Sequence, residues 1–167
     1  MTDSGLDVLL YPDPALRRKA EPVDTFDDEL VEFVDALETT ADDSEGLGLS
    51  SIQVGDPRAV LVLRPTADPT APRVYINPEI VDKGSFGLVE ESCLSIPGIS
   101  GLVLRATKVT VRAQDASGEH FECELAGMDA VSLQHEVDHL DGVLFIDRLS
   151  IVKRILLRLT GKTRGGA

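Results

Sequence analysis

The residues with the clearest chemical potential lie in the stretch LQHEVDHLDG, residues 133–142. It places His135, Glu136 and His139 in the order H-E-x-x-H. On a helix, positions i and i+4 share one face, so the two histidines can bind one metal ion, with the glutamate placed as a general base. A catalytic zinc-type site needs three protein ligands and one open position. The sequence therefore predicts a metal site whose third ligand comes from elsewhere in the chain.

The third ligand is expected upstream of this motif. The 28 residues after His139 contain no histidine and no glutamate. Asp141 follows too closely along the helix to turn back onto the site, and Asp147 stays open as a weaker alternative. His120, the remaining histidine, shares its strand face with two glutamates and is typical of an exposed surface residue.

The two cysteines differ in their surroundings. Cys123 alternates with Phe121 and Leu125, which is typical of a small buried side chain. Cys93 lies in ESCLSIPG among serines and glutamates, which is poor core sequence, and a thiolate is a strong ligand for zinc or iron(II). Cys93 is therefore the predicted third ligand, with a buried structural cysteine as the alternative. Neither cysteine belongs to a C-x-x-C pair, and we expect a reducing compartment.

Composition limits the class of protein. The chain has 167 residues, 43% of them hydrophobic, which is enough for one globular domain spanning 1–167. Its longest apolar runs, such as AVLVL at 59–63, are far too short to span a membrane. The N-terminus MTDSGLDVLLYPDP has no basic segment followed by an apolar stretch, so no signal peptide is expected, and an organellar transit peptide stays open.

Charge is spread unevenly along the chain. The net charge of −13 argues against general binding to nucleic acid. Residues 1–147 hold all 29 acidic residues and 10 basic ones, a net −19, whereas 148–167 hold six basic residues and no acid, a net +6. This tail includes a helix expected at about 149–160. A basic tail on an acidic body suggests an anionic partner for the tail alone.

Hydrophobic periodicity and element order predict an α+β fold. Mainly antiparallel β-sheets are expected to pack around the central H-E-x-x-H helix, with an N-terminal and a C-terminal helix beside them. The first helix is expected at 25–43 with Thr25 as its N-cap, and the glycine-rich loop GLGLSSIQVGD follows it. The remaining elements expected are strands at 59–64 and 73–81, an extended segment at 88–98, a hairpin of 102–113 with 119–125, and helices at 129–141 and 149–160.

Three segments taken together resemble the signature motifs of peptide deformylases. They are GLGLSSIQV (46–54), ESCLS (91–95) and QHEVDH (134–139). Further stretches that resemble the family are LYPDPALRRKAEPV (10–23), INPEI (76–80), VLRATKVTVRAQD (103–115) and HLDGVLFIDRLS (139–150). Positions that depart from the usual pattern are Ser50, Ser51, Ser92 and Ser100. The departures leave the predicted metal ligands intact and concern the shape and charge of the substrate channel.

The resemblance implies a mechanism and a metal. It implies hydrolysis of the N-terminal formyl group of newly made proteins, with Glu136 moving the proton. It places the side-chain amide of Gln53 and the backbone N–H of Leu94 as donors to the oxyanion. Ligand chemistry alone favours zinc, whereas the resemblance implies one native Fe(II), with Zn(II), Ni(II) or Co(II) as replacements. Candidate substrate-binding residues are Gly46, Leu47, Gly48, Glu91, Met128 and Val131. Ordinary core packing is the alternative for Leu47, Met128 and Val131.

The resemblance also implies partners and a location. The expected substrates are N-formylmethionyl nascent polypeptides, handled by a monomer in a bacterial-type cytoplasm. The basic C-terminal helix resembles an extension that docks on ribosomal RNA, and a solvated helix end is the alternative. Neither a membrane nor a sequence-specific nucleic acid is expected as a partner.

Three other functions remain open on the sequence alone. The serine departures allow a deformylase that acts on another N-formyl compound. A metallopeptidase of the H-E-x-x-H type would instead cleave unformylated peptides. A structural zinc protein would need a fourth protein ligand, for which the sequence offers no good candidate.

Overall fold

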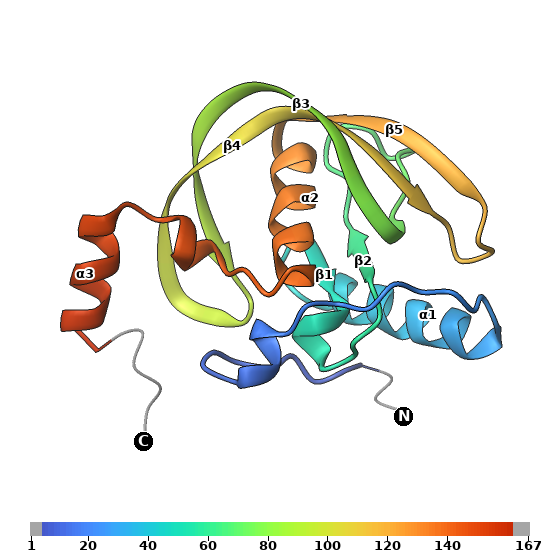
Figure 1. Ribbon diagram of the computed structural model, residues 1–167, viewed down its shortest axis with the longest axis horizontal. Helices are drawn as coiled ribbons and strands as arrows, with labels where there is room; N and C mark the ends of the chain where they lie inside the picture. The colour runs from blue at the N-terminus through green and yellow to red at the C-terminus, as the bar shows by residue number, and fades with distance from the viewer. Residues whose placement is uncertain (1–4, 162–167) are drawn as a thin grey trace.

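The computed structural model describes residues 5–161 and has the predicted α+β architecture (Figure 1). Its elements are η1 (Pro14–Arg17), α1 (Asp28–Asp42), β1 (Gly48–Ser50), η2 (Ser51–Val54), β2 (Val60–Leu63), β3 (Val74–Cys93), β4 (Ile96–Gln114), β5 (His120–Ala126), α2 (Gly127–Leu140), η3 (Phe145–Arg148) and α3 (Ile151–Leu159). The H-E-x-x-H helix, α2, stands at the centre, and the sheet arches over it. The prediction of antiparallel strands around this helix is confirmed.

The five strands form one antiparallel sheet in sequence order, β1-β2-β3-β4-β5. Its dominant unit is the β3–β4 hairpin, which pairs from Ile76↔Gln114 to Cys93↔Ile96. The sequence predicts a strand at 73–81 and a separate extended segment at 88–98 here, and that division is wrong, because β3 runs without a break through Pro78 from Val74 to Cys93. The register shifts between Ile76 and Glu79, and an irregularity of this kind lets a residue without an N–H sit inside a strand.

A capping carboxylate sets the start of α1, and a glycine follows the end of α2. Helix α1 begins after Asp27, whose carboxylate accepts the Leu30 N–H at 3.0 Å, so Asp27 rather than Thr25 is the N-cap. Helix α2 ends before Gly142, which has φ 72°. A Cβ on that glycine would lie 2.5 Å from the carbonyl oxygen of Arg17, so glycine is required where the chain turns past the N-terminal segment.

Strands β1 and β2 lie between α1 and α2, in contact with both helices. The glycine-rich segment that was expected to be a loop contains β1, which pairs with β2 from Gly48↔Leu63 to Ser50↔Leu61. The apolar side of α1 packs on one face of these strands, and α2 packs on the sheet from the other side. Within residues 5–161, no helix has the length and apolar character needed to cross a bilayer.

Candidate metal centre

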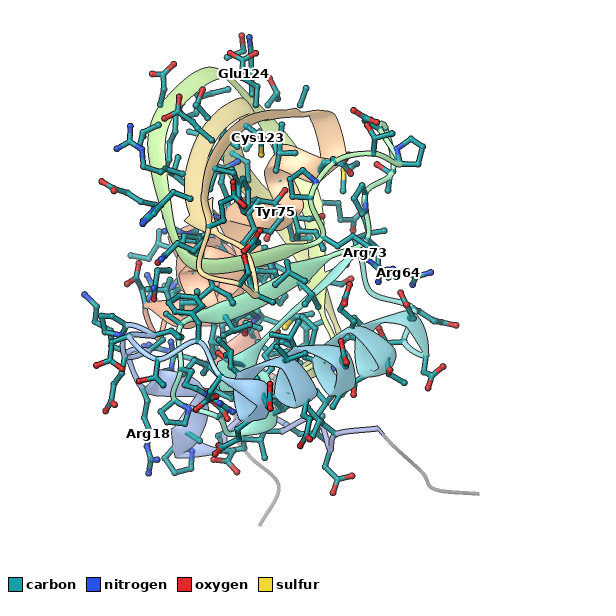
Figure 2. All side chains as sticks on the ribbon, turned by 90° about the vertical axis from the view of Figure 1, so that its right-hand side faces the viewer. Arg18, Arg64, Arg73, Tyr75, Cys123 and Glu124 are labelled. Carbon is teal, nitrogen blue, oxygen red and sulfur yellow. The ribbon has the colours of Figure 1, made fainter. Side chains whose placement is uncertain are left out.

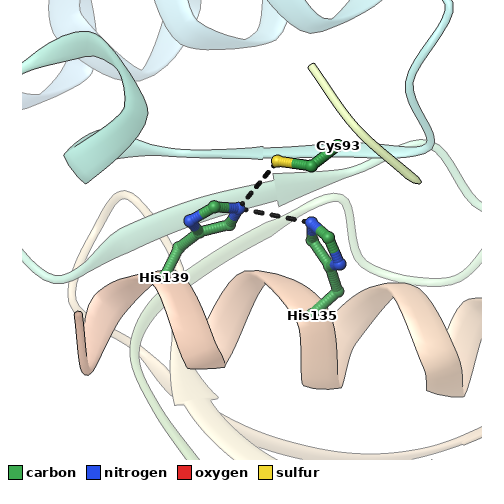
Figure 3. Close-up of side chains that lie close together, drawn as sticks. All are labelled: Cys93, His135 and His139. Carbon is green, nitrogen blue, oxygen red and sulfur yellow. Dashed lines mark hydrogen bonds between the residues drawn. The ribbon is translucent and has the colours of Figure 1, made fainter. Parts of the chain in front are cut away.

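Cys93 and the two motif histidines meet between the end of β3 and one face of α2 (Figure 3). The Cys93 Sγ lies 3.3 Å from His139 Nε2, and the Nε2 atoms of His139 and His135 are 3.2 Å apart. One ligand atom from each of the three buried residues lies within 4.8 Å of the others. The structure therefore brings together the three residues that the sequence nominated.

This arrangement fits a metal ion. Ligands about 2.0–2.3 Å from a tetrahedral zinc-type ion are roughly 3.3–3.6 Å from one another, close to the two separations seen here. Burial lowers the pKa of His139 well below its ordinary value, so its imidazole is neutral and can donate a lone pair. A sulfur and two imidazole nitrogens are donors that suit zinc or iron(II).

A buried chain of charged groups orients His135. Its Nδ1 lies 2.8 Å from Glu91 Oε1, which leaves Nε2 to face Cys93 and His139. Glu91 in turn accepts two hydrogen bonds from Arg105, at 2.6 and 3.0 Å. Burial alone would raise the pKa of Glu91, but the hydrogen bonds from His135 and Arg105 outweigh it and hold that pKa at about 2. Glu91 is therefore a carboxylate whose two oxygens are already engaged.

The same chain of charged groups continues to Asp138, which lies three residues after His135 on α2. Arg105 Nη1 donates to Asp138 Oδ2 at 2.7 Å, and Asp138 also accepts two hydrogen bonds from Arg148. These links are not predicted by the sequence. One signal was available, because Arg105 lies in one of the segments that resemble the family, but nothing in its local pattern names its partners.

Glu136 lies beside the three ligands and is buried, with 4% of its surface exposed. Its Oε2 has no hydrogen-bond partner in the part of the chain that the structure describes. Burial raises its pKa to about 7. Gly48 packs closely against it, since a Cβ there would lie 2.9 Å from Glu136 Cγ. The carboxyl is thus buried against Gly48, with Oε2 left without a partner among the described residues.

Gln53 faces the same centre. Its Oε1 accepts from the Ser50 N–H at 3.0 Å and from Ser50 Oγ at 3.1 Å. Its Nε2 consequently points toward Cys93 Sγ, 3.7 Å away, and donates to Ser95 Oγ at 3.2 Å. Ser50, noted in the sequence as a departure from the family pattern, fixes the orientation of the amide.

A cavity of about 440 Å³ opens beside the centre. Its lining includes all six candidate substrate-binding residues, Gly46, Leu47, Gly48, Glu91, Met128 and Val131. Gln53, Cys93, Leu94, His135 and Glu136 also line it. The cavity thus connects the candidate reacting groups with the candidate binding surface.

The other histidine, the other cysteine and the alternative aspartate ligand lie away from the metal centre. His120 is exposed on β5, as expected. Cys123 is half-buried on the sheet, with its Sγ 3.9 Å from the Tyr75 hydroxyl (Figure 2). Asp147, the alternative third ligand, forms an ion pair with Arg17 instead.

Comparison with known proteins agrees with this geometry. The model of the polypeptide deformylase family matches residues 6–154. The chain belongs to the peptide deformylase family. It is 42% identical over 159 residues to the peptide deformylase of Chromobacterium violaceum, with 95% of each chain covered. It is 44% identical over 156 residues to that of Hahella chejuensis, with 93% of each chain covered.

Solved peptide deformylases share the fold. The Legionella pneumophila structure has a TM-score of 0.85 at 41% identity, covering 92% of this chain and 91% of the other. The Synechococcus elongatus peptide deformylase, solved in complex with actinonin, has a TM-score of 0.87 at 35% identity and covers 100% and 91%. As a member of this family, the protein is a hydrolase that removes the N-formyl group from newly made polypeptides.

Proposed function

We propose that Cys93, His135 and His139 bind one catalytic divalent metal ion. The observation that supports this is the convergence of one sulfur and two Nε2 atoms at separations of 3.2 and 3.3 Å. A metal bound there would act as a Lewis acid that polarises the formyl carbonyl and lowers the pKa of water. The donor set suits Fe(II) or Zn(II), and we propose Fe(II) as the native metal, with Zn(II), Ni(II) or Co(II) as replacements.

Glu136 is the proposed general base and then general acid. Its carboxylate takes a proton from the attacking water and passes it to the leaving nitrogen as the C–N bond breaks, giving formate and a free amine. Burial raises its pKa to about 7, which suits a group that accepts and releases a proton near neutrality. Its unpartnered Oε2 is the atom proposed to receive the proton.

Gln53 and Leu94 are the proposed donors to the oxyanion. Because Ser50 holds Gln53 Oε1, the amide N–H groups are turned toward Cys93 before substrate arrives. Such a donor contributes on the order of 3 kcal/mol to lowering the barrier. The backbone N–H of Leu94 is proposed as the second donor on the strength of the family resemblance, and Leu94 lines the cavity.

The proposed substrate is an N-formylmethionyl chain. Leu47, Met128 and Val131 supply apolar walls of the cavity for the methionine side chain. Gly46 and Gly48 leave room for the substrate backbone. At Gly48 an added Cβ would press on both Glu136 and Leu63, at 2.9 and 3.0 Å.

The experiment that tests these roles is formate release from formyl-Met-Ala. Protein purified without oxygen and loaded with iron(II) or nickel is compared with Glu136→Ala. We expect turnover to fall by about 10²–10⁴-fold in the variant while the metal stays bound, as judged by metal analysis. Absence of turnover in the metal-loaded wild type would contradict the proposal.

Two further substrates test the alternatives. Formylated amines other than methionine derivatives would be preferred by a deformylase for another compound. Unformylated Met-Ala-Ser would be cleaved by a metallopeptidase, and we expect no cleavage. A structural zinc protein predicts no difference between the wild type and Glu136→Ala.

We also propose that the basic C-terminal region docks on ribosomal RNA. Helix α3 carries Lys153, Arg154 and Arg158 and no acidic residue. Lys162 and Arg164 belong to the same basic tail and lie outside the described residues. Phosphate contacts by these cations would make binding depend on salt.

Charge variants test docking better than truncation does, because Leu157 of α3 belongs to a hydrophobic core cluster. Lys153→Gln, Arg154→Gln and Arg158→Gln combined should reduce co-sedimentation with ribosomes and spare turnover of a short formyl peptide. The control removes the same charge from the sheet, with Lys83→Gln, Lys108→Gln and Arg112→Gln. Equal co-sedimentation of both variants with the wild type would contradict docking.

We propose that the enzyme works as a monomer in the cytoplasm. Both cysteines, each within the described residues, are free thiols, which suits a reducing compartment. Light scattering on the purified protein should give the mass of one 18.0 kDa chain. A dimer mass at micromolar concentration would contradict the monomer.

A further inference from the structure

Most of the large apolar side chains that are exposed between residues 5 and 161 fall into two groups. One group lies on α3, and the other lies on the face of the β3–β4 hairpin that is turned away from α2 (Figure 1). The second group, called here the hairpin patch, consists of Phe86, Leu88, Leu102 and Leu104, which are 62%, 67%, 58% and 61% exposed. These side chains belong neither to a core cluster nor to the lining of the cavity beside the metal centre.

The register of the two strands makes the hairpin patch continuous. Leu88 stands directly opposite Leu104, and Leu102 stands opposite Glu90 in the next pair on the same face. Phe86 precedes Leu88 by two residues and therefore shares its side of β3. Directly opposed Cβ atoms are about 4.5–5.5 Å apart, and diagonal neighbours are within reach of long or aromatic side chains. A contiguous apolar patch of this kind is typical of a surface that binds another molecule.

The hairpin patch begins where the cavity opens. The four successive residues of β3 from Glu90 to Cys93 all line the cavity. Because side chains alternate along a strand, Glu91 and Cys93 are buried at the metal centre, whereas Glu90 and Ser92 are exposed. Beyond Ile76, β3 pairs only with β4 in the part of the chain that the structure describes, so its other edge is free here. The cavity therefore opens around this edge onto the outer face that carries the patch.

The position of the hairpin patch fits the downstream part of a substrate chain. A chain held with its formyl group at the buried centre has to continue outward through the opening, which Glu90 borders. From Glu90 to Phe86 the outer face of β3 extends roughly 13 Å, at about 3.3 Å per residue, which an extended peptide covers with about four residues. All four side chains of the patch are apolar, so the segment that fits them is apolar too.

We propose that the hairpin patch binds an apolar segment of the formylated chain that lies about four to eight residues after the methionine. This inference rests on the proposed function of the adjoining cavity. Contacts so far from the formyl group are the same in the ground state and the transition state, so they lower KM and leave kcat unchanged. Because one side of the bound segment stays in solvent, the gain is about three- to tenfold in kcat/KM.

The kinetic test compares formyl peptides of different length and composition. Formyl-Met-Ala-Ser is too short to reach the patch. Two ten-residue peptides begin with the same three residues and end in two lysines for solubility, and they carry either leucine and valine or serine and threonine at positions five to eight. We expect the apolar ten-residue peptide to have the higher kcat/KM by three- to tenfold, through a lower KM. Equal values for the two long peptides would overturn the proposal.

Variants assign the difference to the hairpin patch. Leu88→Ser combined with Leu104→Ser should remove it and spare turnover of formyl-Met-Ala-Ser, because neither residue lines the cavity. The matched control is Leu156→Ser combined with Leu159→Ser, at two leucines of α3 that are 52% and 78% exposed, and it should keep the difference. An equal loss in both double variants would mean that surface apolarity in general decides, which overturns the proposal.

A second copy of the chain is the competing occupant of the hairpin patch. Light scattering on the wild type and on Leu88→Ser combined with Leu104→Ser tests for it. We expect both proteins to have the mass of one chain. A wild-type dimer that the double variant converts to a monomer would place a second copy on the patch and overturn the binding of substrate there.

A binding measurement separates this inference from the proposed function. The chain contains no tryptophan, so Phe86→Trp adds a single fluorophore to the hairpin patch. In protein that also carries Glu136→Gln, the apolar ten-residue peptide should shift the emission of this fluorophore to shorter wavelength, whereas the polar peptide and formyl-Met-Ala-Ser should not. Leu159→Trp, on α3, is the control and should show no shift with any peptide.

The two failures are then distinct. If no peptide releases formate from the wild type, the proposed function fails, yet the emission shift with the apolar peptide would still support binding at the hairpin patch. Release of formate from both long peptides at equal kcat/KM, with no emission shift, would overturn the patch alone.

Discussion

Helices α2 and α3 follow one another in the chain and meet their surroundings in opposite ways. Of the fourteen residues of α2, ten are buried, and six of these are polar or charged. Of the nine residues of α3, six are aliphatic, yet Leu157 alone is buried. The exposed aliphatic side chains are Ile151, Val152, Ile155, Leu156 and Leu159. Apolar area therefore does not explain which of the two helices lies at the centre.

Helix α2 is fixed by partners for its polar groups. Asp129 accepts hydrogen bonds from the Thr66 and Ala67 N–H groups, at 2.8 and 3.1 Å. Gln134 pairs in both directions with the backbone of Ala106 on β4, at 3.1 and 2.8 Å. Because burial of a polar group is costly unless it is hydrogen-bonded, these contacts specify one position and one rotation of the helix. That rotation points the two motif histidines at Cys93.

Helix α3 has one buried side chain, and it is apolar rather than polar. Leu157 packs in a cluster with Leu16, Phe145 and Ile146, while the aliphatic side next to it faces solvent. An aliphatic surface beside three cations is typical of a region that a partner covers. Helix α2 thus lies against the candidate metal centre, whereas the exposed aliphatic side of α3 is compatible with the partner proposed for it.

The largest expected effect comes from breaking the charged network on α2. Arg105→Leu leaves Glu91 buried without a guanidinium partner and Asp138 with Arg148 alone, and we expect the free energy of unfolding to fall by about 3–5 kcal/mol. Metal affinity should also fall about 10–100-fold, because Glu91 orients His135. Urea unfolding of the metal-free protein and a metal titration measure the two effects.

The control is Arg112→Leu, which removes an exposed ion pair with Glu122 on the sheet. Its cost should be about 0–1 kcal/mol. An equal loss in free energy of unfolding for Arg105→Leu and Arg112→Leu would mean that the polar contacts of α2 do not fix its position. The difference proposed between α2 and α3 would then be wrong.

The next effect concerns the one anchor of α3. Leu157→Ala should lower the free energy of unfolding by about 2–4 kcal/mol, because it empties space in a buried cluster. Leu159→Ala, two residues on and 78% exposed, should change it by less than about 0.5 kcal/mol. Calorimetry on both variants checks the difference, and similar values would contradict the orientation of α3.

The metal ligands could be predicted from the sequence, whereas the residues that hold them in place could not. Spacing alone nominated His135 and His139, and the polar neighbours of Cys93 nominated the third ligand, because metal chemistry restricts residue types strongly. The link from Glu91 through Arg105 to Asp138 joins positions 14 and 33 apart in sequence, and no local pattern records it.

Three further features could not be predicted from the sequence, each for a physical reason. The Ser50 hydroxyl donates to Gln53 Oε1, but nothing in the local sequence distinguishes this serine from any other small polar residue. The aliphatic side of α3 follows the periodicity of a core-facing helix, but periodicity reports only that two faces differ and not which one the molecule covers. The boundary of α1 was misplaced because Thr25 and Asp27 are both good N-caps.

A smaller effect on stability is expected from Asp147 in η3, between α2 and α3. Partial burial raises the pKa of Asp147, but hydrogen bonds from Arg17 and the Leu144 N–H outweigh it and leave that pKa below its ordinary value. A lowered pKa adds stability above the unfolded value of about 3.9 and loses it as the pH falls through the folded value. Asp147→Asn should therefore cost about 1 kcal/mol at pH 7, discounted for exposure, and progressively less as the pH falls below the unfolded value and through the lowered folded pKa. Unfolding across pH 3–7 measures it, and a cost independent of pH would contradict the charged pair.

The smallest effect is expected on the exposed side of α3. Ile155→Ser combined with Leu156→Ser should change the free energy of unfolding by less than about 0.5 kcal/mol, because these side chains, 50% and 52% exposed, gain little from folding. Turnover of a short formyl peptide should also stay unchanged. Urea unfolding at two protein concentrations is the measurement. A cost above about 1 kcal/mol that grows with concentration would mean that a second copy covers this side in solution, since only association makes stability depend on concentration. A cost of that size at every concentration would place α3 against its own sheet, and the contrast with α2 would then reduce to two buried helices with different partners.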